Sequence, residues 1–183
     1  DCTGLTHVTF PDSLSIIRKS AFKGCTGLAS VILPDGLTSI EGSAFADCTG
    51  LTHLTFPDSL KTIADDAFSY CKELTSVTFP ATASLTTISR AFTGCTKLPS
   101  ITFPNSLTTI GDRAFFGCPE LTSVNFPDSL TTIGKNAFHG LTGLTGSLTI
   151  PDSVTSIGQS AFSACSGLTG SLTIPDSVTT IGN

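Results

Sequence analysis

Residues 121–138 read Leu-Thr-Ser-Val-Asn-Phe-Pro-Asp-Ser-Leu-Thr-Thr-Ile-Gly-Lys-Asn-Ala-Phe. This stretch recurs along the whole chain with few changes, and a leucine opens every copy. Successive opening leucines lie 23 or 24 residues apart: they are Leu5, Leu28, Leu51, Leu74, Leu98, Leu121, Leu144 and Leu168. A fixed period in this range is typical of proteins built from stacked repeats.

Two further columns keep the same period and fix the register of the repeat. A proline occurs once in each unit: Pro11, Pro34, Pro57, Pro80, Pro104, Pro127, Pro151 and Pro175. An Ala-Phe pair ends most units, with its aromatic member at Phe22, Phe45, Phe68, Phe92, Phe115, Phe138 and Phe162. No single unit is large enough to bury its own apolar face, so neighbouring units must stack on one another.

The order of residues within a unit predicts its local structure. The opening pattern predicts a strand in which Val124 and Phe126 share one face, because side chains alternate along a strand. The following proline ends that strand, since it cannot donate to the ladder. Leu130 and Ile133 predict a second extended segment, and residues 112–117 predict a turn of helix or 3₁₀-helix.

The position after the isoleucine of the second extended segment, which is Ile133 in the unit quoted above, holds glycine in some units and a larger residue in others. Gly111, Gly134, Gly158 and Gly182 alternate there with Arg18, Glu41, Ala64 and Ser89. We therefore expect no strict requirement for positive φ at this position. The phenylalanines of the Ala-Phe pairs are expected to form a continuous internal ladder.

Composition excludes several classes of function. The net charge is −5 and the nine basic residues are scattered, which argues against nucleic acid as a partner. No apolar run reaches the roughly 18 residues of a membrane-spanning helix. The chain starts and stops within a repeat, so we expect residues 1–183 to be a single domain cut from a longer protein. End-to-end association or fraying is expected at Leu5–Phe10 and Leu172–Ile181, where strand edges are uncovered.

The seven cysteines fall in one column, three residues after the Ala-Phe pair where that pair is present: Cys2, Cys25, Cys48, Cys71, Cys95, Cys118 and Cys165. Leu141 fills the same column in the remaining unit, so the position accepts an apolar side chain. Buried free thiols are therefore favoured, over disulfides between adjacent units and over a metal site, for which no short Cys-x-x-Cys spacing exists.

Polar columns offer no catalytic arrangement. Asp12, Asp35, Asp58, Asp128, Asp152 and Asp176 recur after the proline and are interpreted as turn-capping residues rather than calcium ligands. His7 and His53 occupy one outward column, and His139 lies elsewhere. No nucleophile, base and acid converge in the pattern, so we expect no catalytic site, no metal and no cofactor.

The outward side of the first strand is the candidate binding face. Its residues are short, mostly hydroxylated and uncharged, although threonine is also simply well suited to an exposed strand. The candidate site residues are His7, Thr9, His53, Thr55, Thr78, Thr102 and Asn125.

The whole unit, L-T-S-V-x-F-P-D-S-L-T-T-I-G-x-x-A-F-x-x-C, resembles the BspA-like leucine-rich repeat, also called the Treponema pallidum type. The resemblance implies a leucine-rich-repeat solenoid: a right-handed superhelix of about eight coils, with a parallel sheet on one face and short strands and 3₁₀ or helical turns on the other. It also implies a cell-surface or secreted protein that adheres to host matrix or cell-surface proteins.

Two functions follow from these expectations. The first is a protein-binding or adhesion module, favoured by the variation among exposed residues of the earlier units. The second is a structural spacer without a ligand of its own. Residues 144–158 and 168–182 favour the spacer, since they differ only at Ser156 and Thr180.

Overall fold

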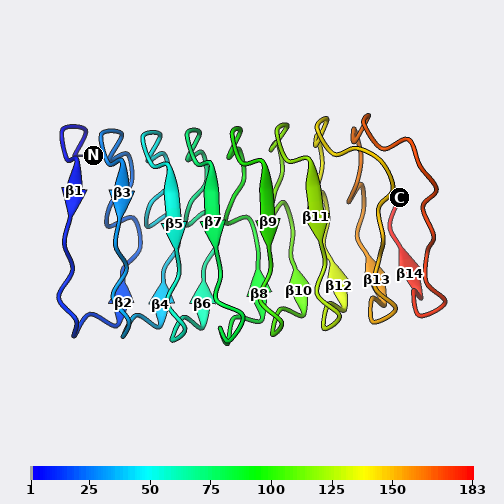
Figure 1. Cartoon of the computed structure of the whole chain (residues 1–183), viewed down its shortest axis with the longest axis horizontal. Coiled ribbons are helices and arrows are strands. Elements are labelled where there is room, and N and C mark those ends of the chain that lie inside the picture. The colour runs from blue at the N-terminus through cyan, green and yellow to red at the C-terminus, as the bar shows by residue number, and fades with distance from the viewer. Residues whose placement is uncertain (1) are drawn as a thin grey trace.

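The computed structural model describes residues 2–183 as a row of coils lying side by side from the N-terminus to the C-terminus (Figure 1). Most coils contribute two short strands to two separate parallel sheets, and no helix forms within the described residues. The predicted repeat solenoid is therefore confirmed. Within the described residues there is also no helix long and apolar enough to cross a membrane.

The first sheet has six strands, one from each of the first six coils, in the order β1-β3-β5-β7-β9-β11. Equivalent residues of successive coils pair in register, such as Thr55 with Thr78. The strands are β1 (His7–Val8), β3 (Ser30–Val31), β5 (His53–Thr55), β7 (Ser76–Thr78), β9 (Ser100–Thr102) and β11 (Ser123–Asn125).

The second sheet has eight strands and runs the full length of the solenoid, in the order β14-β13-β12-β10-β8-β6-β4-β2. The extended segment predicted around Ile133 belongs to it, whereas Leu130 lies just before the strand. The strands are β2 (Ile16–Ile17), β4 (Ser39–Ile40), β6 (Thr62–Ile63), β8 (Thr87–Ile88), β10 (Thr109–Ile110), β12 (Thr132–Ile133), β13 (Ser156–Ile157) and β14 (Thr180–Ile181).

The last two coils depart from the prediction of an opening strand in every unit. Around Gly146 the chain carries the extra residues of the longer units, and the first sheet ends at β11. Two isolated bridges join the last two coils to each other, Gly146 with Leu168 and Thr149 with Thr173. The insertion shifts the short strand out of register with its neighbour, so the exposed sheet covers six coils rather than eight.

The predicted phenylalanine ladder fills the core. Rings of the Ala-Phe pairs stack nearly parallel, with centroids 5.6 Å apart between Phe92 and Phe115 and 5.5 Å apart between Phe115 and Phe138. Phenylalanines of the first strand column pack against this ladder edge-on, as Phe103 does on Phe115 at 5.7 Å. Offset and edge-to-face contacts of this kind are the favoured aromatic geometries.

The segment after the second strand forms successive turns, not the expected helical or 3₁₀ turn. In the first coil the amides of Ala21, Lys23 and Cys25 each bond a carbonyl three residues earlier. The intervening amides of Ser20 and Phe22 instead donate to carbonyls of the next coil. Alternating the bonds in this way satisfies the backbone both within and between coils, whereas a helix would turn every amide along its own axis.

These turns require two positive φ angles in each coil. One lies just before the Ala-Phe pair, where φ is 52° at Arg90 and 51° at Arg113, and the other lies four residues later, where φ is 69° at Gly117. We expected no strict positive φ at the position after the second strand. This is confirmed, since φ is not positive at Gly111, which follows Ile110 of β10. The left-handed positions are two and six residues further on, and most of them hold residues other than glycine. These are Ser20, Ser43, Asp47, Asp66, Tyr70, Arg90, Arg113, Asn136, Ser160 and Ala164.

Side-chain hydroxyls add a further set of bonds between coils. Ser129 Oγ donates to Leu107 O at 2.6 Å, and Ser153 Oγ donates to Leu130 O at 2.6 Å. Threonine at the start of the second strand does the same, as Thr131 Oγ1 donates to Thr108 O at 3.0 Å. The abundance of serine and threonine is thus explained in part by these hydroxyl bonds to backbone carbonyls of the preceding coil.

Candidate binding face

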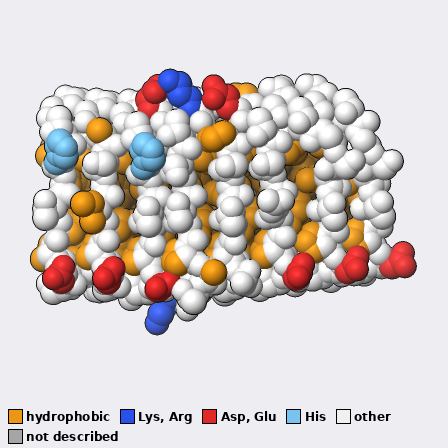
Figure 2. All heavy atoms as spheres, in the orientation of Figure 1, with side chains coloured by type: hydrophobic (Ala, Val, Ile, Leu, Met, Phe, Trp, Pro, Cys, Tyr) orange, Lys and Arg blue, Asp and Glu red, His pale blue; other side chains and the backbone are white. Residues whose placement is uncertain are grey.

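The outward side of the six-stranded sheet presents two exposed columns of side chains, which we call the strand face. The first column is His7, Ser30, His53, Ser76, Ser100 and Ser123, and the second, two residues later, is Thr9, Ile32, Thr55, Thr78, Thr102 and Asn125. Figure 2 shows this face as almost free of charged side chains, with two histidines near one end.

The structure places all seven candidate residues on the strand face. His7 and His53 lie in the first column, separated by Ser30, which pairs with both of them. Thr9, Thr55, Thr78, Thr102 and Asn125 lie in the second column and are all exposed. Because strand residues alternate, the residues between the two columns, such as Val77, point inward and are buried.

The orientation of His53 is fixed by the threonine before it. His53 Nδ1 lies 2.7 Å from Thr52 Oγ1, whose own proton is donated to Ala29 O at 3.1 Å. Since the hydroxyl proton is used, Nδ1–H is the donor to Thr52, and Nε2 of the neutral ring is left as an acceptor. His7 Nδ1 makes the equivalent contact with Thr6 Oγ1 at 2.9 Å.

Six of the seven cysteines are buried inside the solenoid, as predicted, and all seven thiols are free. Five of the thiols donate to the carbonyl of the Ala-Phe phenylalanine in the preceding coil, as Cys118 Sγ does to Phe92 O at 3.2 Å. Burial raises the pKa of the Cys118 thiol to about 12 and raises those of Cys71 and Cys95 well above the ordinary range. Cys2, in the first coil, is the exposed member.

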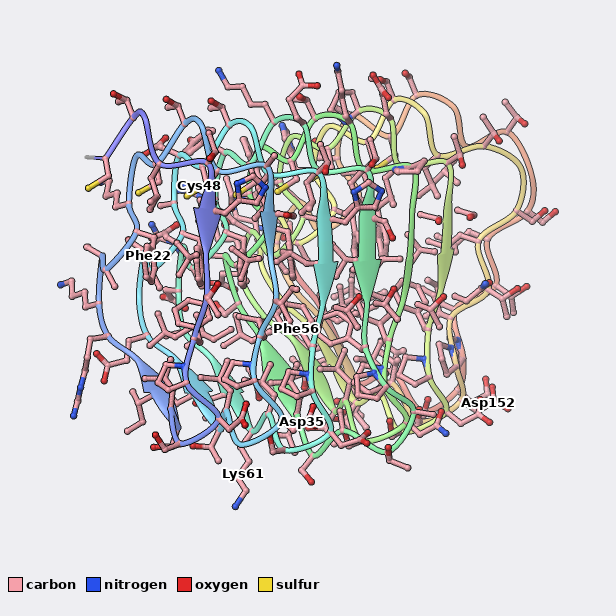
Figure 3. The ribbon with its side chains drawn as sticks, turned by 60° about the vertical axis from the view of Figure 1, so that its left-hand side comes forward. Phe22, Asp35, Cys48, Phe56, Lys61 and Asp152 are labelled. Atoms are coloured by element: carbon pink, nitrogen blue, oxygen red, sulfur yellow. The ribbon has the colours of Figure 1, made fainter. Side chains whose placement is uncertain are left out.

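The aspartate column forms a row along one edge of the strand face, visible in Figure 2 and marked by Asp35 and Asp152 in Figure 3. The capping role expected for it is wrong: the turn is closed by a backbone bond, as from Leu60 N to Pro57 O at 3.2 Å. Asp58 instead accepts a bond from the Thr82 hydroxyl of the next coil. Among residues 2–183 no group of potential ligands is placed to hold a metal ion.

Sequence reasoning missed a second distinctive surface, on the turns opposite the strand face. There Arg90 pairs with Asp66 at 3.1 Å, and Arg113 lies over the ring of Phe116 at 5.8 Å from its centroid. His139 stacks on the same ring at 4.9 Å. These side chains come from the variable positions that flank the Ala-Phe pair. The left-handed turns at Arg90 and Arg113 place them together on one surface, which we call the turn ridge.

The stacked coils, the parallel strand face and the interior leucine, phenylalanine and cysteine columns define a leucine-rich-repeat protein. The model of the BspA type leucine-rich repeat region matches residues 1–90 and 82–183, in 6 copies. The chain therefore belongs to the BspA-type leucine-rich-repeat family. No curated protein matches the sequence.

Solved structures show the same architecture. The T. pallidum leucine-rich-repeat protein TpLRR is 31% identical, with a TM-score of 0.76, over 84% of this chain and 72% of that one. A leucine-rich-repeat protein of Bacteroides ovatus is 26% identical, with a TM-score of 0.53, over 99% of this chain and 70% of that one. A Eubacterium ventriosum protein, at 24% identity and a TM-score of 0.78, shares the fold; 92% of this chain spans 44% of its length.

Proposed function

We propose that this chain is a non-catalytic protein-binding module of a cell-surface or secreted protein, and that the strand face contacts the partner. The partner class is a host extracellular-matrix or cell-surface protein. The observation that carries the proposal is the contrast between interior and exterior columns. Interior positions repeat almost unchanged, whereas the exposed columns vary between histidine, serine, threonine, isoleucine and asparagine.

The chemistry of the strand face supports a protein ligand. It is nearly uncharged and rich in hydroxyls that can donate or accept hydrogen bonds. Its backbone is held by in-register ladders, so little conformational entropy is lost when a partner settles on it. Membership of the BspA-type leucine-rich-repeat family supports both a binding role without catalysis and a surface or secreted location.

The test is binding to a panel of purified extracellular-matrix proteins, with alanine variants of His53, Thr78 and Asn125. We expect at least one matrix protein to bind and at least one variant to weaken that binding severalfold. Each side chain is exposed, so the variants should keep the far-ultraviolet circular dichroism spectrum of the parent. Binding that no variant weakens would count against the strand face.

A structural spacer is the second candidate function. The nearly identical coils 144–158 and 168–182 favour it, and the first sheet does not extend over them. A spacer would bind none of the panel proteins, which separates it from the adhesion module. End-to-end self-association through Leu5–Phe10 and Leu172–Ile181 stays a prediction; Leu172 and Ile181 are 48% and 59% exposed, which supports it.

A further inference from the structure

We propose that Ile32 is the apolar anchor of the strand face, and that the hollow beside it accepts an apolar side chain of a partner protein with a lysine or arginine close by. This inference rests on the proposed function and names the part of the strand face that gives it specificity. A hollow of about 240 Å³ lies at the equivalent place beside Asn125, so Ile32 rather than the hollow itself distinguishes this part of the strand face.

Ile32 is the most exposed large hydrophobic residue described, at 82% exposure. Single exposed aliphatic residues are ordinary on protein surfaces, but this one interrupts a column that otherwise holds threonine and asparagine. Its in-column neighbours are Thr9 and Thr55. A threonine would meet every local requirement of that strand position, so nothing in the fold calls for isoleucine.

A hollow lies beside Ile32 on the strand face, between the coils that carry β3 and β5. These two strands pair through Ser30 and His53. The hollow has a volume of about 260 Å³ and is lined by both coils. Leu33 and Phe56, which are 7% and 2% exposed, lie at its base. An apolar side chain inserted next to Ile32 would therefore contact aliphatic and aromatic carbon.

The polar rim of the hollow supplies acceptors and a negative charge. Asp35 is exposed at one side, and His53, whose Nε2 is an acceptor, lies at the other. Asp35 has no ion pair among the described residues, and neither lysine nor arginine lines the hollow. Lysine and arginine carry several donors and no acceptor, so one of them next to the apolar side chain matches this rim. Ion-pair complementarity of this kind adds selectivity more than affinity.

The occupant is a different protein rather than a second copy of this chain. Two copies meeting face to face at Ile32 would each offer Asp35 and His53 and no cation. The carboxylates would then lose water without gaining an opposite charge, which costs free energy. A partner that brings its own cation avoids that cost.

The experiment selects a phage-displayed library of random linear peptides on the immobilised 183-residue chain. We expect enriched peptides to carry a large apolar residue within a few positions of lysine or arginine. Ile32→Thr restores the residue found at the equivalent position of other coils, so it should fold normally. It is expected to weaken the enriched peptides at least tenfold, whereas Gln159→Ala, on the exposed turns away from the strand face, leaves them unchanged.

A charge reversal tests the rim. Selection on Asp35→Lys should enrich aspartate or glutamate where selection on the parent enriches lysine or arginine. Asp152→Lys, at the equivalent position of a distant coil, provides the matched control and should leave the selected motif unchanged. An unaltered motif on Asp35→Lys would overturn the assigned chemistry of the partner.

Other outcomes separate this inference from the proposed function. Peptides that ignore Ile32→Thr but are lost with His53→Ala or Asn125→Ala would overturn the anchor and leave the strand face as a binding surface. Failure to enrich any peptide overturns the anchor, and the matrix-protein panel then decides on the strand face. A dimer seen by sedimentation that Ile32→Thr abolishes would show that a second copy covers the hollow, and would also overturn the inference.

Discussion

At the scale of single residues, the solenoid depends on side chains that meet their own counterparts in the next coil. Phe115 is fully buried and its ring stacks on Phe92 and on Phe138. Phe162 has a stacked ring on one side only, at Phe138, and is half-buried. The same residue type in the same column thus has a different number of partners according to its place in the row.

This difference predicts unequal losses of stability. Phe115→Ala should lower the free energy of unfolding by about 3–5 kcal/mol, since a large buried ring is removed and its neighbours cannot close the gap. Phe162→Ala should cost clearly less. Chemical denaturation of both variants measures the difference, and equal losses would contradict the stacked ladder.

The buried thiols predict a dependence of stability on alkaline pH. Burial raises the pKa of the Cys118 thiol from 9.0 to about 12. Between those values the unfolded chain loses this proton while the folded chain keeps it, so stability is fully present below pH 9 and falls as the pH rises. The fall is about 1.4 kcal/mol per pH unit for each such thiol.

Urea denaturation at pH 8 and pH 10 measures this dependence, with Cys118→Ala as the comparison. The variant should be less stable at pH 8, because a small cavity replaces the thiol, and should lose less stability between the two pH values. An equal loss of stability between pH 8 and pH 10 in both proteins would show that folding does not raise the pKa of the Cys118 thiol. Rapid labelling of the native protein by a thiol reagent at Cys2 alone would agree with burial of the others.

At the scale of elements, the turns carry the strain of the fold. A left-handed conformation costs a residue with a side chain roughly 1–2 kcal/mol relative to glycine. Each coil accepts that cost because its turn alternates backbone bonds between its own residues and the next coil. Arg90 and Arg113 occupy such positions without any local signature, which is why sequence patterns predicted a helical turn instead.

Paired substitutions test the left-handed turn. Gly117 has φ of 69° and no atom within 4 Å of an added Cβ, so Gly117→Ala isolates the conformational cost. It should destabilise the protein by about 1 kcal/mol, after allowance for the reduced freedom of the unfolded chain. Ala164→Gly, at the equivalent position with φ of 59°, should be neutral or stabilising. Destabilisation by both changes, measured by thermal unfolding, would count against the conformation assigned to this position.

The sequence could predict those elements whose side chains repeat with the period. Val77 and Phe79 alternate with exposed residues, and the buried ladder and thiol column follow from the same spacing. The hollow beside Ile32 could not be predicted, since it depends on how the side chains of two neighbouring coils lie next to one another. The loss of the first strand after β11 was also missed, because the insertion near Gly146 changes register without changing the apolar pattern.

At the scale of the whole molecule, the interior is nearly uniform along the row and the exterior is not. The strand face is nearly uncharged, and its end near His7, Ile32 and His53 differs from the rest in its side chains. The turn ridge opposite carries arginines, carboxylates and aromatic rings. The aspartate row lies along one edge of the strand face. The proposed binding surface, the strand face, is therefore separate from the stacked core. Substitutions of its exposed side chains should leave that core intact.

The most direct test compares one new charge on each side of the solenoid. Thr102→Glu places a carboxylate in the middle of the strand face, and Gln159→Glu places one on the exposed turns. Surface plasmon resonance is measured with the matrix protein that binds the parent most tightly. The dissociation constant should rise at least tenfold for Thr102→Glu and stay unchanged for Gln159→Glu. A loss confined to Gln159→Glu, or binding unaffected by Thr102→Glu, would contradict the strand face as the binding surface.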